Sequence, residues 1–76
     1  MSPAESEHTG IHCRLDELLE QRDMTLTRLS ETVGVSLVNL SVLKNDRARA
    51  IRFSTLVAIC EALDCEVGDL LVRQAP

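Results

Sequence analysis

Aromatic residues are almost missing from this sequence of 76 residues: Phe53 is the single one, and tryptophan and tyrosine do not occur. Stacking platforms for single-stranded nucleic acid and aromatic cages for ammonium groups both need several rings, so neither kind of site is available. The short length excludes a two-domain enzyme, because a chain of this size forms one small domain. The core of such a domain leaves little room for a large substrate cavity.

Long apolar runs are also missing. No stretch of about 18 apolar residues exists to span a bilayer, and residues 1–5 lack the basic start and apolar core of a signal peptide. We therefore expect a cytoplasmic protein with no membrane partner. Cys13, Cys60 and Cys65 are odd in number and form no CxxC pair, which favours reduced thiols over a disulfide framework.

Metal binding and catalysis have weak sequence signals. The residue types that ligate zinc occur at His8, His12, Cys13, Cys60 and Cys65. Cys60 and Cys65 are five apart, wider than zinc-site spacing, and free cysteine often behaves as a small buried apolar residue. Metal or redox sensing stays open as an alternative. Because no Gly-rich phosphate loop or Ser/His/Asp set can be placed, we expect no enzyme, no metal, no cofactor and no small-molecule ligand.

The apolar pattern predicts one all-α domain. Residues 1–10 are polar and contain Pro3 and Gly10, so we predict a disordered N-terminal tail, followed by a folded domain over 11–72 and a C-terminal tail over 73–76. Apolar residues at helical spacing predict five helices, near 14–22, 26–33, 37–45, 55–64 and 67–71. Alternation at Ile11, Cys13 and Leu15, with a β-favouring Leu71-Val72, allows a short terminal β-pairing.

Capping residues mark the helix boundaries. Thr25, Ser36 and Ser54 each precede a predicted helix, where a hydroxyl can accept a hydrogen bond from a free amide of the first turn. Phe53 is placed to act as a hydrophobic staple before Ser54. Gly34 falls where a sharp turn needs a positive φ, which glycine adopts without a Cβ penalty.

The helices at 26–33 and 37–45 have the pattern of a helix-turn-helix, in which the first helix braces the second against the DNA major groove. This motif needs a small residue where the helices cross, met by Ser30, and a glycine in the turn, met by Gly34. It also needs apolar side chains inside, which are Leu29, Val33, Val35, Leu40 and Leu43. The alternative is an ordinary helix pair in a bundle.

The net charge of −4 and the pI near 5.0 argue at first against a nucleic-acid partner. The charge is unevenly distributed, however. Residues 36–52 hold four basic side chains and one acidic side chain, a net +3, so the rest of the chain carries −7. Phosphate contacts need only local positive charge, and this segment includes and follows the predicted reading helix. A solvated charged loop is the alternative.

We predict that the helix at 37–45 reads bases through Leu37, Val38, Asn39, Ser41 and Val42. The three apolar side chains suit thymine methyl groups, and Asn39 and Ser41 can form hydrogen bonds to base edges or phosphates. Phosphates are assigned to Thr25, Ser36, Lys44, Asn45, Arg47, Arg49 and Arg52. Such contacts position a protein on the duplex without specifying a sequence.

The stretch MTLTRLSETVGVSLVNLSVLKN, followed by ARAIRFSTLVAICEALDCEVGDLL, resembles the short Cro/repressor-type (xenobiotic-response-element type) transcriptional regulators of bacteria. The resemblance covers about residues 11–72. It implies a compact five-helix Cro/repressor-like fold, sequence-specific binding of double-stranded DNA by the third helix, and a homodimer on a two-fold operator. Many members have glutamine at the start of the second helix and at the start of the reading helix, where this chain has Leu26 and Leu37-Val38.

The predicted function is thus a DNA-binding transcriptional regulator that acts as a repressor. The alternative is a protein-interaction module, such as an antitoxin or an adaptor that contacts the transcription machinery. The docking or dimer surface would then be formed by Val67, Leu70, Leu71 and Val72.

Overall fold

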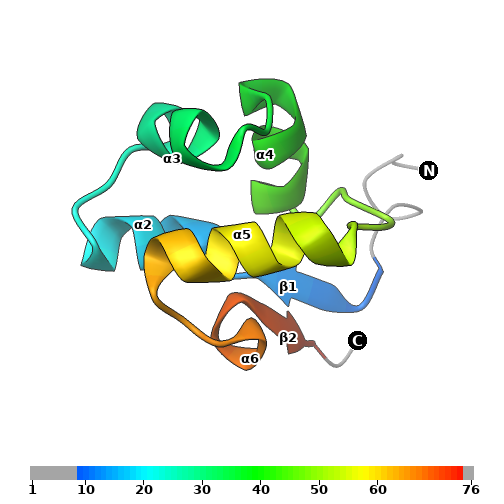
Figure 1. The fold of residues 1–76 in the computed structure, drawn as a ribbon. Coiled ribbons are helices and arrows are strands. Elements are labelled where there is room, and N and C mark those ends of the chain that lie inside the picture. Colours follow the sequence, from blue (N-terminus) through cyan, green and yellow to red (C-terminus); the bar gives the residue numbers. More distant parts are fainter. Residues whose placement is uncertain (1–8, 75–76) are drawn as a thin grey trace.

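The computed structural model describes residues 9–74, in which five helices and two strands pack around one small core (Figure 1). In chain order the elements are β1 (Ile11–Cys13), α2 (Leu15–Gln21), α3 (Leu26–Val33), α4 (Leu37–Lys44), α5 (Phe53–Leu63), α6 (Val67–Leu70) and β2 (Leu71–Arg73). The five predicted helices are all present, and each lies within two residues of its predicted start. Within these residues, no helix is long and apolar enough to cross a membrane.

The two strands join the ends of the domain. β1 and β2 pair antiparallel, with Ile11 opposite Arg73 and Cys13 opposite Leu71. The pairing continues outward, because the amide of Gln74 donates to the carbonyl of Gly10 at 2.7 Å. Gly10 and Arg73 therefore belong to the ordered sheet region, whereas the sequence places both in tails. Residues 1–8 and 75–76 of the predicted tails lie outside the described residues.

The start of α5 differs from the prediction. Ser54 is not the N-cap: Arg52 holds that position, and its carbonyl accepts the first helical hydrogen bond, from the amide of Leu56. Ser54 therefore lies inside the first turn. Phe53 is 83% exposed, so it does not act as a hydrophobic staple. Both predictions fail because the helix begins two residues earlier than its apolar stripe indicates.

The core is formed by one apolar side of every helix and by Cys13 of β1. The fully buried side chains are Leu15, Leu29, Leu40, Ile59, Leu63 and Leu70. Burial of Leu70 contradicts the docking surface predicted at the C-terminal end. Leu71 and Val72 are half-buried in β2, so only Val67, which is 47% exposed, faces solvent as that prediction requires.

Candidate nucleic-acid interface

Helices α3 and α4 are joined by a turn that fixes their angle. Gly34 has φ +73° and ψ 27°, the left-handed conformation that favours glycine, and its amide donates to the Ser30 carbonyl at 2.9 Å. The predicted caps are confirmed: the hydroxyl oxygens of Thr25 and Ser36 accept hydrogen bonds from the amides of Arg28 and Asn39. The turn and both helix starts are therefore determined by local side chains.

α4 has one buried side and one exposed side. Leu40 and Leu43 are buried against the core, as the spacing predicts. On the other side, Val38 is 72% exposed, and Leu37 and Val42 are exposed as well. Exposed apolar side chains that are neighbours on one element, unlike single scattered ones, are typical of a binding surface. α4 therefore presents an apolar face, with Asn39 exposed beside it.

The segment after α4, residues 47–52, is held in place by two of its apolar side chains. Ala48 and Ile51 are half-buried and pack against the core. Arg47, Arg49 and Arg52 are exposed between and beside them. The segment is a loop without regular secondary structure, and its apolar residues anchor it. The three arginines consequently project from a fixed backbone.

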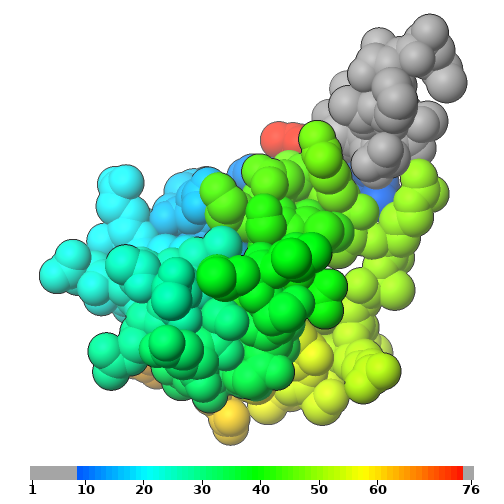
Figure 2. All heavy atoms as spheres, turned by 90° about the horizontal axis from the view of Figure 1, so that it is seen from above, coloured from blue at the N-terminus to red at the C-terminus, as the bar shows by residue number. Residues whose placement is uncertain are grey.

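A groove of about 590 Å³ separates α4 from this segment. Figure 2 looks onto this side of the molecule, where α3 and α4 (green) adjoin the segment that leads to α5 (yellow-green). Six of the predicted contact residues line the groove: Ser36, Asn39, Val42, Arg47, Arg49 and Arg52. The fold thus brings together two predicted base-reading side chains and most of the predicted phosphate contacts.

Thr25 lies apart from the groove, at the start of α3, and is exposed. Both Thr25 and Ser36 accept a hydrogen bond from their own helix, and each hydroxyl keeps its O–H as a donor. A phosphate oxygen can accept that proton. The free amides of a helix N-terminus further favour an anion at these positions.

Lys44 and Asn45 are engaged within the protein. Lys44 Nζ lies 3.5 Å from Asp16 Oδ1, so this side chain ties α4 to α2. The side-chain amide of Asn45 donates to the Ser41 carbonyl at 2.9 Å and lies 3.3 Å from the Ser41 hydroxyl. An exposed ion pair contributes only about 0–1 kcal/mol, so Lys44 can exchange its partner. The groove does not include Lys44, Asn45 or Ser41.

Two residues at the edge of the interface are not assigned by the sequence reasoning. Asp46 follows Asn45, the C-cap of α4, and its Oδ2 lies 2.8 Å from Nδ1 of His12 on β1. This hydrogen bond is the main reason that the pKa of His12 lies above its ordinary value of 6.5, with a smaller contribution from Glu17. The sequence signal is an aspartate at the position after a helix C-cap, where glycine is common.

The cysteines are free thiols, and Cys13 and Cys60 are buried. Burial raises the pKa of the Cys13 thiol to about 11, and that of Cys65 is raised to about 11 by burial and by the neighbouring Cys60. From Thr9 to Gln74, no three His, Cys, Asp or Glu side chains come together as a metal site. His8, which the metal alternative includes, lies outside the described residues.

A braced helix pair with an exposed second helix and a basic groove beside it defines the class of helix-turn-helix DNA-binding proteins. The comparisons with known proteins agree. The model of the Cro/C1-type HTH DNA-binding domain matches residues 14–76. The chain therefore belongs to the Cro/C1-type helix-turn-helix family, a family of DNA-binding transcriptional regulators and not of enzymes.

Two relatives resemble this chain closely. YozG of Bacillus subtilis (strain 168), an uncharacterized HTH-type transcriptional regulator, is 56% identical over 62 residues, which cover 82% of this chain and 74% of YozG. The crystal structure of the transcriptional regulator VanUg superposes with a TM-score of 0.70 at 32% identity, covering 90% of this chain and 92% of VanUg.

Proposed function

We propose that this protein binds a specific double-stranded DNA sequence by inserting α4 into the major groove, and that it represses transcription by occupying that sequence. One observation carries the proposal: a groove lined by three arginines adjoins the exposed apolar face of α4. Arginine suits phosphate oxygens, and valine and leucine suit thymine methyl groups. Reading and positioning groups are therefore adjacent.

The uneven charge supports the same function. The +3 segment over residues 36–52 contains α4 and the arginine loop, while the rest of the chain carries −7. A duplex would be attracted to this side and repelled by the others, which favours one orientation of approach. Asp46, the only acidic residue in the segment, is paired with His12, so its charge is partly neutralised when His12 is protonated.

We also propose a homodimer on DNA. Two copies of α4 about 34 Å apart would meet successive major-groove half-sites on one face of the duplex. Sedimentation of the protein with a duplex that carries one or two half-sites would count the bound copies. Two bound copies on the paired half-sites are expected, and a single copy on that duplex contradicts the dimer. A cytoplasmic location and reduced thiols go with this function.

The direct test is to mix the protein with random-sequence duplexes at low salt, retain the bound fraction and sequence it. We expect an enriched motif rich in A·T pairs at the positions that face Val38 and Val42. A folded sample that retains no duplex would rule the proposal out. Placing the enriched site over a promoter then tests repression, which predicts lower reporter expression with the protein than without it.

A triple substitution of Lys44, Arg47 and Arg49 by alanine distinguishes DNA binding from the protein-interaction alternative. DNA binding should collapse in this variant, because three positive charges near the phosphates are lost together. A module that binds only a protein partner would keep that partner. Circular dichroism checks that the variant is folded, which we expect because all three side chains lie outside the buried core.

A further inference from the structure

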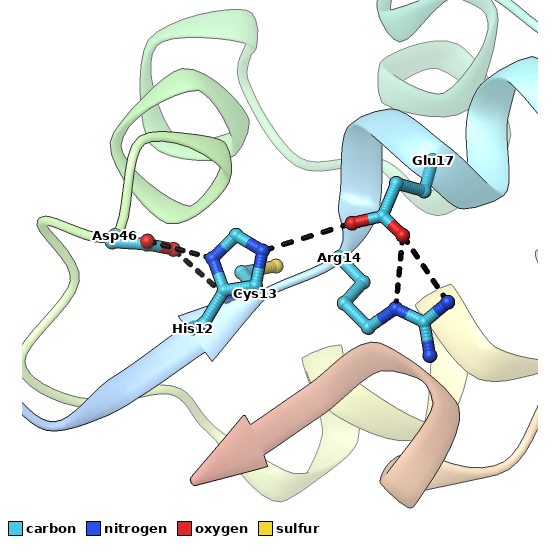
Figure 3. A network of polar contacts seen from close by, with 5 residues as sticks. All are labelled: His12, Cys13, Arg14, Glu17 and Asp46. Atoms are coloured by element: carbon cyan, nitrogen blue, oxygen red, sulfur yellow. Dashed lines mark hydrogen bonds and ion pairs between the residues drawn. The ribbon is translucent and has the colours of Figure 1, made fainter. Parts of the chain in front are cut away.

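The Asp46 carboxylate connects two distant parts of the chain. Its Oδ1 accepts a hydrogen bond from the amide of Cys13 at 2.7 Å, and its Oδ2 lies 2.8 Å from Nδ1 of His12 (Figure 3). His12 and Cys13 belong to β1, whereas Asp46 lies between α4 and the arginine loop. We call this arrangement of Asp46, His12 and Cys13 the Asp46 clamp.

The clamp is extended to α2 through the second ring nitrogen of His12. His12 Nε2 lies 3.7 Å from Glu17 Oε1, and Glu17 Oε2 lies 3.2 Å from both Nε and a terminal nitrogen of Arg14 (Figure 3). Three elements, β1, α2 and the end of α4, are thus joined by polar contacts. The loop that carries Arg47 and Arg49 begins at this junction.

The backbone of Asp46 shows that an aspartate is not the easiest residue at this position. Its φ is +63°, the left-handed region in which a side chain is strained and glycine is favoured. The amides of Asp46 and Arg47 donate to the carbonyls of Leu43 and Val42, which is a helix C-terminal motif that commonly has glycine here. The carboxylate offsets that strain through two hydrogen bonds.

The charge of Asp46 is also unfavourable for DNA binding if charge alone is considered. Asp46 is the single negative residue in the segment 36–52, which also contains four basic residues. Removing it would raise the net charge of that segment from +3 to +4 and strengthen attraction to phosphates. Asp64 has the same backbone conformation, so it is the electrostatic cost of Asp46, together with the two contacts of its carboxylate, that points to a compensating role.

We propose that Asp46 is a positioning residue for DNA binding: its carboxylate fixes the end of α4 to β1 and thereby sets where Arg47 and Arg49 stand beside the groove. This inference rests on the proposed function. The two interpretations of Asp46 predict opposite changes in DNA affinity when its carboxylate is removed. If Asp46 acts only as a negative charge, it weakens DNA binding, and its removal strengthens binding. If Asp46 is a positioning residue, it strengthens DNA binding, and its removal weakens binding.

The decisive variant is Asp46→Gly, which removes the carboxylate and also relieves the strain of a side chain at positive φ. The matched control is Asp64→Gly, because Asp64 also has a positive φ, 51°, at the end of a helix. Within residues 9–74 the Asp64 carboxylate forms no hydrogen bond or ion pair, and it lies outside the groove. Both substitutions remove one negative charge and one left-handed side chain, and only one removes the clamp.

The measurement is the affinity for the enriched duplex by fluorescence anisotropy, at one salt concentration and at a temperature where circular dichroism shows every variant folded. We expect Asp46→Gly to bind about tenfold more weakly, the effect of losing one charge-assisted hydrogen-bond pair. Asp64→Gly should bind as tightly as the unchanged protein or slightly more tightly. Asp46→Asn keeps an acceptor for the Cys13 amide and should recover part of the loss.

A double substitution tests whether His12 acts through Asp46. His12→Ala should weaken DNA binding in the unchanged background and have no further effect in the Asp46→Gly background, since the partner is already gone. Asp46→Gly that binds DNA as tightly as the unchanged protein, or more tightly, overturns the proposal. Additive losses for the two substitutions overturn the role assigned to His12.

A readout without DNA separates this inference from the proposed function. In Asp46→Gly, the Cys13 amide should exchange with solvent faster, and backbone NMR order parameters over residues 47–51 should fall. Unchanged exchange and order in a folded variant overturn the clamp, whatever the protein binds. If the unchanged protein retains no duplex, the proposed function fails, and these two measurements still decide whether Asp46 holds the loop.

Discussion

The hydroxyl of Ser30, on α3, donates a hydrogen bond to the carbonyl of Val35, in the turn before α4. A small residue is expected at position 30 because the two helices cross there. The structure adds a second reason for serine, because the hydrogen bond closes the turn across five residues of chain. Together with the Gly34 turn, this hydrogen bond therefore holds α4, and with it the exposed face of α4, at its angle to α3.

The same turn gives a prediction about stability. Gly34→Ala should lower the free energy of unfolding by about 1–2 kcal/mol, because alanine is strained at φ +73°. A Cβ at this position would meet no atom within 4 Å, so no steric clash contributes. Urea unfolding measures the change. Gly68→Ala, inside α6 and also free of contacts, is the control and should be neutral or slightly stabilising.

The salt dependence of DNA binding should show whether the arginines of the groove contact phosphates. Replacing Arg47, Arg49 or Arg52 singly by alanine should make the log–log slope of affinity against salt shallower by about 0.9 each, the effect of one lost phosphate contact. Arg73→Ala, an exposed arginine in β2 and outside the groove, should leave the slope unchanged. An unchanged slope for all three loop variants would contradict phosphate binding by this segment.

Substitutions of Val38 and Val57 distinguish an apolar side chain that contacts bases from one that is merely exposed. Val38 on α4 is 72% exposed and Val57 on α5 is 52% exposed, so Val→Ala at either should change stability by less than about 0.5 kcal/mol. Only Val38→Ala should change the enriched DNA motif, through a lost contact with a thymine methyl group. Repeating the random-duplex selection with both variants checks this; equal motifs from both would remove Val38 from the reading face.

The protonation of His12 should link pH to stability. Asp46, with Glu17, raises the pKa of His12 in the folded protein above 6.5, so the protonated form is favoured by folding. This contribution is complete below pH 6.5, the unfolded pKa, and is lost as pH rises through the folded pKa. Urea unfolding from pH 6 to pH 8 should therefore show a steeper decline for the unchanged protein than for His12→Gln.

An NMR titration checks the cause directly. The His12 ring should titrate above pH 6.5, and Asp46→Asn should lower its pKa because the main stabilising partner loses its charge. His8→Gln assigns the two histidine signals. Parallel stability curves for the unchanged protein and His12→Gln, or a His12 pKa that ignores Asp46→Asn, would contradict the linkage.

Local patterns predict much of this molecule. The apolar spacing predicts α3 and α4, and Thr25 and Ser36 cap them as expected, because these features depend on residues within one or two turns. The position of Gly34 follows from the same local chemistry. The start of α5 was not predictable in this way, since the Arg52 carbonyl accepts the first helical hydrogen bond before the apolar stripe begins.

Contacts between residues far apart in sequence could not be predicted from local patterns. The pairing of Asp46 with His12 spans 34 positions in sequence, and Lys44 meets Asp16 across 28. No local periodicity reports such pairs, because they exist only after the core has brought β1, α2 and α4 together. The same is true of Leu70, whose complete burial depends on the packing of α6 against α5 and β2 and not on its own short helix.

The sequence by itself determined the class of this protein: five short helices, a turn that requires glycine, and a basic segment in an acidic chain. Each of these depends on backbone preference or charge, which are properties of the residues themselves. Only the tertiary structure decided which basic side chains share a groove with α4, and which are tied to other helices. Distances between side chains far apart in sequence are set by packing, so the geometry of the interface emerges only when the core is formed.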